Sequence, residues 1–276
     1  MSDRVIISIA DGVADVRFNR PDKRNALDRE QFAAIAEAGE SLKSADGVRV
    51  VVLSGVGESF CAGLDFSMFS GMAESGPRAT VRVADDHEQR GDPGQMVDGR
   101  ITHLGQQVCW VWQELHVPVI AAVHGHALGG GLQIALGADI RIAHPATKWS
   151  VREVHWGLVP DMTGTFTLSR LVRSDVAREL TYTARMLDGR EAFELGLVTR
   201  LSETPYDDAM ALAREIAGRS PGAVRGAKAL FNRMYADGAA DQFAEERRVI
   251  AGQIGSPDQV EAIMSNLEHR APAFAD

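Results

Sequence analysis

The sequence predicts an α/β protein, and three observations carry that prediction. Two runs rich in β-branched residues, 48–55 and 117–125, are continuously apolar, as strands are when helices cover both faces of a parallel sheet. Each run follows a stretch with the apolar spacing of a helix, so the chain repeats a helix-to-strand unit. From about residue 162 onward the pattern is mostly helical. The 276 residues are enough for one large domain or two modest ones.

A hairpin and a helix are expected ahead of the first buried strand. Apolar and polar residues alternate on both sides of Asp11-Gly12, a dipeptide that favours a two-residue hairpin turn. After a polar loop, Asp28 and Gln31 form a capping-box pattern that opens a helix. We expect Gly47 to end that helix. Its apolar face consists of Phe32, Ile35 and Leu42.

A second helix is predicted over 97–115, just ahead of the second buried strand, because its large apolar residues recur every three or four positions. These residues are Ile101, Leu104, Val108, Val111, Trp112 and Leu115. Between the two units, residues 71–100 are polar, carry glycine and proline and show weak periodicity, which indicates a long loop. Such a loop is either a mobile cover over a site or a plain surface insertion.

The last part of the chain is predicted to consist of helices. Ser174 is expected to cap one helix, Gly196 to end another and Pro221 to start a third. The last 75 or so residues contain no convincing buried strand. We therefore divide the chain into a core, residues 1–200, and a C-terminal helical region, residues 201–276, which would pack on the core or on another subunit.

Composition excludes several classes of protein. The residues are 45% hydrophobic and 24% charged, which is ordinary for a globular protein. No run of about 18 apolar residues is present, and no signal peptide is visible, so we expect no membrane span. The two cysteines, Cys61 and Cys109, suggest a reducing, cytoplasmic location. The net charge of −9 argues against nucleic acid or an anionic membrane as the main partner.

Two glycine-bearing loops follow the buried strands and offer backbone N–H groups to a ligand. They have the sequences FCAGLD (60–65) and ALGGGLQ (127–133), and the second one opens a helix. In open α/β folds, ligands bind at the carboxyl ends of the strands. One N–H from each loop, with Gly130 at the helix start, could converge on a developing oxyanion. Alternatively, the glycines only permit tight packing of strand and helix.

A carboxylate follows in the stretch WSVREVHWGLVPDMTGT (149–165). Glu153 lies 20 residues after Gln133 and 8 residues before Asp161. A carboxylate on a loop beside an oxyanion hole is placed to move a proton at a carbon next to a carbonyl. The alternative for any single glutamate is a solvated surface charge. Histidine does not cluster with cysteine or carboxylates at metal-ligand spacing, so we expect no metal site.

Five ordered stretches of the chain match one known family. They are NRPDKRNALD, VVLSGVGESFCAGLDF, PVIAAVHGHALGGGLQIALGADIRIA, EVHWGLVPDMTGT and DGREAFELGLVTRL, across roughly 5–201, and SPGAVRGAKALFNR matches in the tail. With these stretches the chain resembles the crotonase superfamily, also called the enoyl-CoA hydratase/isomerase family. The resemblance implies a spiral of ββα repeats with a C-terminal helical trimerisation region. It also implies a homotrimer, or a hexamer built as a dimer of trimers.

The same resemblance implies a ligand and its binding residues. The substrate would be an acyl-CoA thioester, with coenzyme A as part of the substrate and no separate cofactor. The oxyanion hole would consist of the N–H groups of Leu64 and Gly130, which would hold the thioester oxygen as it becomes an enolate. The substrate and coenzyme A would contact Lys23, Arg24, Ala26, Ala62, Gly63 and Asp65.

The resemblance also implies which residues carry the reaction, with one departure from the family pattern. Hydratases of the family use glutamates at positions 133 and 153, but this chain has Gln133, which can orient a group and cannot exchange a proton near neutral pH. Dienoyl-CoA isomerases match at Glu153 and Asp161, yet they too carry an acid at position 133. Several monofunctional isomerases of the family use a single glutamate.

We therefore expect an enzyme that isomerises a double bond by shuttling a proton at Glu153. Asp161 would reprotonate the far carbon, orient Glu153 or cap the following turn, and Gln133 would position substrate or water. One alternative is hydration of a 2-enoyl-CoA. A second is a catalytically weak acyl-CoA-binding protein.

Overall fold

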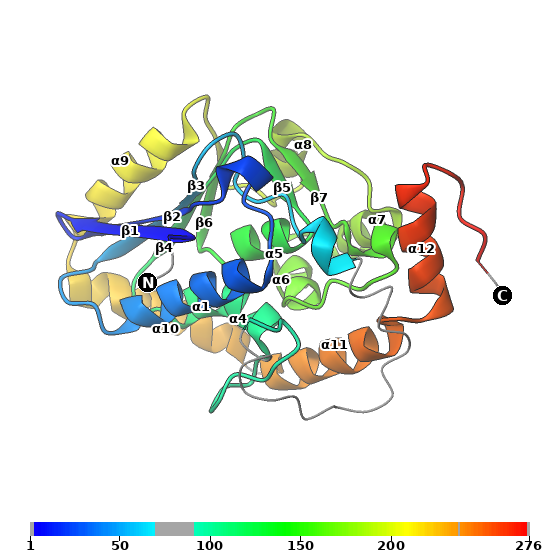
Figure 1. Ribbon diagram of the computed structural model, residues 1–276. Helices are drawn as coiled ribbons and strands as arrows, with labels where there is room; N and C mark the ends of the chain where they lie inside the picture. The colour runs from blue at the N-terminus through cyan, green and yellow to red at the C-terminus, as the bar shows by residue number, and fades with distance from the viewer. Residues whose placement is uncertain (1–2, 70–90, 237, 275–276) are drawn as a thin grey trace.

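The computed structural model describes residues 3–69, 91–236 and 238–274, and its centre is a six-stranded sheet. The strand order is β1-β2-β3-β4-β6-β8, in which β1 pairs antiparallel with β2 and the other neighbours are parallel. The strands are β1 (Val5–Ala10), β2 (Val13–Phe18), β3 (Val50–Gly55), β4 (Val119–Val123), β6 (Ile140–Ala143) and β8 (Arg200–Leu201). A separate parallel pair consists of β5 (His126–Leu128) and β7 (Lys148–Ser150). Helices surround this sheet, which confirms the predicted α/β class (Figure 1).

The helices are α1 (Arg29–Lys43), α4 (Leu104–Glu114), α5 (Gly130–Leu136), α6 (Gly164–Leu171), α7 (Ser174–Thr183), α8 (Gly189–Glu194), α9 (Pro205–Ala217), α10 (Pro221–Ala236), α11 (Ala239–Gln253) and α12 (Pro257–Leu267). The chain also has two short 3₁₀ helices, η1 (Pro21–Lys23) and η2 (Glu153–Trp156). In the part of the chain that the structure describes, no helix is both long and apolar enough to cross a bilayer.

Different helices cover the two faces of the sheet. Side chains of a strand alternate between faces, and in β3 Val50 and Val52 pack in a cluster with the alanines of α9. Val51 and Leu53 belong to the larger cluster that contains the apolar faces of α1 and α4. Figure 1 shows α9 on one side of the sheet and α1 with α4 on the other. The first helix of the predicted C-terminal region is therefore a layer of the core.

The N-terminal hairpin forms as predicted. Asp11 and Gly12 have φ angles of 52° and 81°, and two positive φ angles are what a type I′ turn requires. Asp28 also caps α1 as expected, since its carboxylate accepts from the N–H of Gln31 at 2.9 Å. The return half of the capping box is absent, because the Gln31 side chain donates to the carbonyl of Arg4 at 3.3 Å. The cap was therefore predictable, and its reciprocal bond was not.

Three predicted helix boundaries are wrong. The first helix ends at Lys43, four residues before the expected stop at Gly47. The second begins at Leu104 instead of 97, because a turn segment occupies 91–101 and His103 caps the helix. Ser174 is the first residue of α7 and not its cap. Gly196 does follow α8 with φ 91°, and α10 begins at Pro221, both as predicted.

The predicted loop at 71–100 falls largely outside the described residues. Residues 91–100 consist of turns and bends with one isolated bridge. The idea that this segment covers a site therefore stays a prediction.

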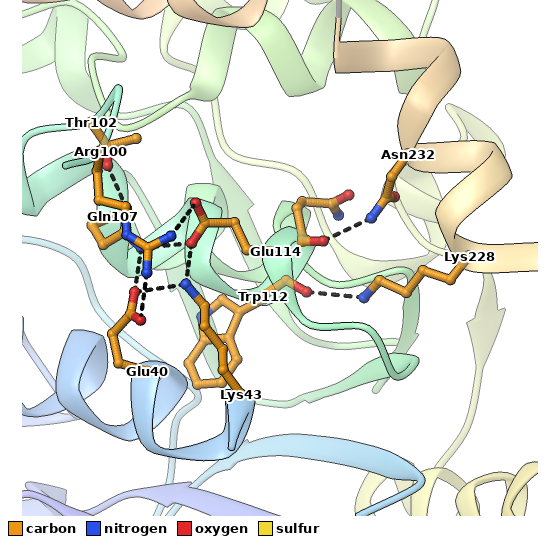
Figure 2. Close-up of polar contacts among 10 residues, drawn as sticks. Glu40, Lys43, Arg100, Thr102, Gln107, Trp112, Glu114, Lys228 and Asn232 are labelled. Carbon is orange, nitrogen blue, oxygen red and sulfur yellow. Dashed lines mark hydrogen bonds and ion pairs between the residues drawn. The ribbon is translucent and has the colours of Figure 1, made fainter. Parts of the chain in front are cut away.

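A polar network joins α1 to α4 (Figure 2). Lys43 Nζ lies 2.8 Å from a carboxylate oxygen of Glu40 and 2.5 Å from one of Glu114. The side-chain amide of Gln107 donates to the same two carboxylates at 2.9 Å. Arg100 bonds Glu40 from the loop that precedes α4, at 2.9 Å. These contacts fix the loop before α4 against α1.

Helix α10 is attached to the core by its polar side (Figure 2). The buried ammonium of Lys228 donates to the carbonyls of Trp112 and Val117, at 3.0 and 2.9 Å, and to Asp139 at 2.8 Å. Asn232 donates to the carbonyl of Gln113 at 2.7 Å. The large apolar residues on the other side are exposed: Leu230 by 70%, Phe231 by 64% and Met234 by 73%. The helix thus carries its apolar residues on the outside.

Candidate functional site

The two glycine-bearing loops lie side by side, as the sequence predicts. Cys61 forms a parallel bridge with Ala127, and its N–H donates to the carbonyl of His126 at 2.9 Å. The approach is close at Gly63, where an added Cβ would lie 2.7 Å from the carbonyl oxygen of Leu128. Gly63 also has φ 90°, so only glycine fits there without strain. The second loop first forms β5 and only then opens α5 at Gly130.

Among the described residues, both predicted oxyanion-hole amides lack a hydrogen-bond acceptor. Among the hydrogen bonds of the described residues, none uses the N–H of Leu64 or of Gly130. Gly130 begins α5, and the first N–H groups of a helix have no partner within it. The amides of Asp65 and Gly129 are occupied, since Asp65 donates to Leu27 and Gly129 donates to Ser150. Each loop therefore offers at least one N–H that has no acceptor among the described residues, at Leu64 and at Gly130.

Gln133 holds Glu153 in place. Its amide nitrogen donates to Glu153 Oε1 at 2.6 Å, and its amide oxygen accepts from the N–H of Met162 at 3.0 Å. The second bond fixes which end of the amide is the oxygen, so the nitrogen must face Glu153. The side chain is fully buried. Gln133 therefore positions a carboxylate, a partner that the sequence did not reveal.

The Glu153 carboxylate has one held oxygen and one unpartnered oxygen. The residue is 8% exposed, and among the described residues its Oε2 has no hydrogen-bond partner. Burial raises the pKa of Glu153 to about 7, although hydrogen bonds, including that from Gln133, act in the opposite direction. An added Cβ on Gly129 would lie 3.2 Å from its Oε1, so the carboxylate stands beside the second loop. A carboxylate of this kind can accept a proton near neutral pH.

Asp161 lies in the turn between η2 and α6. Burial raises its pKa to about 8, and the negative charges of Glu246 and Glu153 act in the same direction. The possibility that Asp161 caps the following turn is wrong, because Thr163 is the N-terminal cap of α6 and no side chain bonds there as a cap. A protonated Asp161 can donate a proton at neutral pH.

Sequence reasoning missed two residues of this neighbourhood. Glu246, on α11, accepts from the N–H of Thr163 at 3.0 Å and from the hydroxyl of Thr165 at 2.6 Å. It is buried, and its only sequence signal is that it shares a helix face with Phe243 and Ile250. His103 is 3% exposed, and its Nε2 lies 3.7 Å from Asp161 Oδ2. It was not predicted because the expected helix start lay elsewhere.

The predicted coenzyme A residues lie beside the first loop. The carbonyl of Arg24, which has φ 49°, accepts from the N–H of Ala62 at 3.0 Å. Lys23 and Arg24 are exposed, and among the described residues neither side chain has a hydrogen-bond or ion-pair partner. Ala26 is buried next to them, and the carbonyl of Gly63 accepts from the N–H of Leu27 at 2.8 Å. Two backbone hydrogen bonds thus join the segment 23–27 to the first loop at Ala62 and Gly63.

Asp65 differs from the others because protein groups occupy both of its oxygens. Arg20 donates to one at 2.6 Å, and the N–H and hydroxyl of Ser67 donate to the other at 2.9 and 2.8 Å. Burial would raise its pKa, but these donors lower it to about 2. Asp65 therefore holds the loop to the strand-end segment around Arg20.

The geometry combines the Glu153 carboxylate beside the second loop, the Asp161 carboxyl and one N–H on each loop that has no acceptor among the described residues. Such a set can remove a proton and hold the resulting negative charge on an oxygen. Among the described residues, no group of three histidine, cysteine or acidic side chains is arranged to hold a metal ion.

Comparisons with known proteins point to one family. The family model described as "Enoyl-CoA hydratase/isomerase" matches residues 13–276. Enoyl-CoA hydratase domain-containing protein 2, mitochondrial, of Mus musculus is 33% identical over 273 residues, covering 95% of this chain and 84% of that protein. Delta(3,5)-Delta(2,4)-dienoyl-CoA isomerase, peroxisomal, of Arabidopsis thaliana is 30% identical over 261 residues, covering 94% and 91%.

A solved structure supports the fold in the same way. The enoyl-CoA hydratase/isomerase from Pseudoalteromonas atlantica T6c matches with a TM-score of 0.82 at 28% identity, over 99% of this chain and all (100%) of that chain. This match confirms the crotonase-like core that the sequence motifs implied.

Proposed function

The chain belongs to the enoyl-CoA hydratase/isomerase family, and from that premise we propose that it isomerises the double bond of an enoyl-CoA thioester with Glu153 as the base. The observation that carries this proposal is the Glu153 carboxylate. Gln133 holds one of its oxygens at 2.6 Å, while the other is buried and unpartnered among the described residues. Its pKa of about 7 suits a group that takes up and releases a proton in each turnover.

The proposed reaction conserves all atoms of the substrate. Glu153 Oε2 takes a proton from C2 of a 3-enoyl-CoA, and the C–H electrons form an enolate whose charge lies on the thioester oxygen. The N–H groups of Leu64 and Gly130 stabilise that oxygen, each by about 3 kcal/mol. A proton then adds to C4, the C2–C3 double bond forms and the carbonyl is restored. The C4 proton comes back from Glu153 or is delivered by Asp161.

Coenzyme A would lie along two adjoining segments, one with Lys23, Arg24 and Ala26 and the other with Ala62 and Gly63. The support is that both cations are exposed and lack protein partners among the described residues. Asp65 would contribute indirectly, by holding the first loop in place through Arg20.

Hydration of a 2-enoyl-CoA is the second candidate, because a relative that is 33% identical carries hydratase in its name. Adding water requires one group to take a proton from water and another to deliver a proton to carbon. Gln133 cannot do either. The third candidate is a catalytically weak acyl-CoA-binding protein. It would have the amide donors but lack the pair of glutamates at positions 133 and 153, because position 133 is a glutamine.

We also propose that the protein forms a homotrimer or a dimer of trimers, with α10 in the interface. The support is the exposed apolar side of α10, formed by Leu230, Phe231 and Met234. Large exposed apolar residues that lie together are typical of an interaction surface.

A panel of thioesters tests the catalytic proposal. Purified protein is incubated with crotonyl-CoA, a 3-enoyl-CoA and a dienoyl-CoA, and the products are followed by mass spectrometry and absorbance. We expect conversion of the 3-enoyl-CoA to the 2-enoyl isomer. Glu153→Gln should reduce this rate by about 10²–10⁴-fold, the usual contribution of a general base. Glu194→Gln, at an exposed glutamate on α8, is the matched control and should keep full activity.

Three other outcomes have distinct meanings. Faster formation of 3-hydroxyacyl-CoA from crotonyl-CoA than isomerisation would favour hydration. Binding of coenzyme A compounds without turnover would favour the weak binder. Activity of Glu153→Gln within tenfold of the wild type would remove Glu153 from the mechanism.

A further inference from the structure

The turn that carries Asp161 is held at two successive backbone amides. The N–H of Met162 donates to Gln133 at 3.0 Å, and the N–H of Thr163 donates to Glu246 at 3.0 Å. Thr163 has φ 66°, an unfavourable angle for a β-branched residue that these contacts help to maintain. The backbone of this turn is thus fixed between Glu153, through Gln133, and α11.

The Asp161 carboxyl itself has a different environment. Within the part of the chain that the structure describes, no side chain other than His103 is recorded as a donor or ion-pair partner to it. The two charged groups that raise its pKa, Glu246 and Glu153, are both negative. When Asp161 loses its proton, His103 is therefore the neighbour that can meet the new charge.

The ring of His103 presents a fixed N–H donor toward this carboxyl. Its Nδ1 accepts from the N–H of Gln106 at 3.0 Å, as the cap of α4, so the proton of the neutral ring is on Nε2. That nitrogen lies 3.7 Å from Asp161 Oδ2, about 0.5 Å beyond hydrogen-bond range. Burial lowers the pKa of His103 to about 4; Arg247 acts in the same direction and Asp92 opposes it. The ring is therefore neutral at neutral pH.

The loop that carries His103 is immobilised from both sides. Thr102 bonds Gln107 through its hydroxyl, and Arg100 bonds Glu40 on α1 at 2.9 Å (Figure 2). On the other side, the Gln106 side chain accepts from the backbone N–H of His103 at 3.3 Å and donates to Glu246 at 3.2 Å. The ring is thus fixed in place relative to the same α11 that fixes the Asp161 turn.

We propose that His103 is a positioning residue for Asp161, whose Nε2–H receives the carboxylate when Asp161 delivers its proton to the substrate carbon. This inference rests on the proposed isomerisation, in its form with Asp161 as the acid. In one turnover Glu153 gains the C2 proton and Asp161 gives a proton to C4, forming the new C–H bond. Glu153 then loses a proton to water and Asp161 regains one, so the two carboxyls start the next cycle as before.

The replacement His103→Asn separates this role from helix capping. Asparagine is a good N-terminal cap, so the bond to the N–H of Gln106 is kept, while the donor facing Asp161 is removed. We expect the Asp161 pKa to rise by about 0.5–1 unit, because a hydrogen bond to the charged form is lost. The pKa of Asp161 is measured by ¹³C NMR on protein labelled at the aspartate carboxyl carbons. The signal that is missing from the spectrum of Asp161→Asn identifies Asp161. The basic limb of the pH profile of kcat should move upward equally, and kcat should fall several-fold at unchanged KM.

A measurement on the wild type avoids any dependence on folding of the variant. The ¹⁵N shift of His103 Nε2 should change at the pH where Asp161 titrates, with the ring remaining neutral. Asp188→Ala, which removes the cap of α8, controls for loss of a cap and should leave the Asp161 pKa unchanged.

The results separate the two proposals. An Asp161 pKa that does not rise in His103→Asn, or a His103 Nε2 shift that ignores the Asp161 titration, overturns the role of His103. If the Asp161 pKa shifts as expected but no thioester is turned over by the wild type, the contact stands and the proposed isomerisation fails.

Discussion

The two carboxylate oxygens of Glu153 differ in their hydrogen bonding. Oε1 accepts from the side-chain amide of Gln133, and Oε2 has no partner among the described residues. A carboxylate at position 133 could share a proton with Glu153, whereas Gln133 can only donate to it. Because the Gln133 oxygen is bonded to Met162, its nitrogen always faces Glu153. The residue that departs from the family pattern thus orients the remaining base and leaves one oxygen of it available.

A buried carboxylate of this kind costs stability at high pH. The folded-state pKa of Glu153 is about 7, above its ordinary value of 4.5, so the folded protein binds this proton more tightly than the unfolded chain. The corresponding stability is fully present below about pH 4.5 and is lost as the pH rises to about 7. For Glu153→Gln, we expect the free energy of unfolding relative to the wild type to be higher at pH 8 than at pH 5, by up to about 3 kcal/mol.

Urea unfolding at the two pH values measures this difference. Glu194→Gln removes an exposed carboxylate and should show the same relative stability at both. A Glu153→Gln protein whose relative stability does not change with pH would show that Glu153 is not held in a desolvated state.

At the scale of elements, η2 and α12 meet at a glycine. Gly157 ends η2 with φ 69°, and an added Cβ would lie 2.7 Å from the Cα of Gln259 on α12. Asn266 on α12 also donates to the carbonyl of His155 at 2.9 Å. Since Glu153 is the first residue of η2, contacts between α12 and η2 help to fix the position of Glu153.

Replacing this glycine should separate η2 from α12. Gly157→Ala adds backbone strain and a collision with α12, and we expect a loss of about 2–4 kcal/mol in the free energy of unfolding. Gly47→Ala is the matched control, because Gly47 has φ 76° and no atom within 4 Å of an added Cβ, so it should cost only about 1 kcal/mol. Chemical denaturation of both variants measures the difference. Equal losses of unfolding free energy in the two variants would mean that α12 moves aside for the added methyl group without destabilising the protein.

Local signals in the sequence predicted most elements near the sheet. Asp11-Gly12 sets the hairpin turn by its own backbone preference, and the run at 48–55 is apolar because both of its faces are covered. The start of α4 was misplaced because Ile101 lies in helical register with the later residues, although 91–101 forms turns. Periodicity reports a shared face and does not report where a helix begins.

The candidate site was predictable only where motif and chemistry coincide. Glu153 and the loops of Leu64 and Gly130 could be expected from spacing and resemblance. Glu246 could not, because it lies 83 residues after Thr163, the residue of the Asp161 turn that it contacts. Its burial depends on packing that no local pattern encodes. The bond between Gln133 and Glu153 likewise depends on two side-chain orientations that only the folded chain fixes.

For the whole molecule, the net charge of −9 means that overall attraction cannot bring in a polyanionic coenzyme A thioester. Local groups such as Lys23 and Arg24 would have to bind it. Both cysteines are buried and free, and the cytoplasmic location predicted from them stays a prediction.

The exposed apolar side of α10 gives a test of assembly. We expect the wild type to have the mass of three or six protomers by size-exclusion chromatography with light scattering. Phe231→Asp, which places a charge on this side, should shift the protein toward monomers. Phe274→Asp replaces another exposed phenylalanine, which lies after α12 and outside α10, and should leave the mass unchanged. A monomeric wild type would contradict the proposed interface.

The contact between Glu246 and the N–H of Thr163 has a consequence for the order of events during synthesis. The ribosome delivers the N-terminal part of a chain first, and that part begins to fold before the rest emerges. A nascent chain can therefore bring Gln133 against Glu153 while the turn around Asp161 still lacks its support from α11. The base would be in position first, and the acid would be fixed only when α11 emerges and docks. Nascent-chain activity would accordingly report that α11 has reached its place.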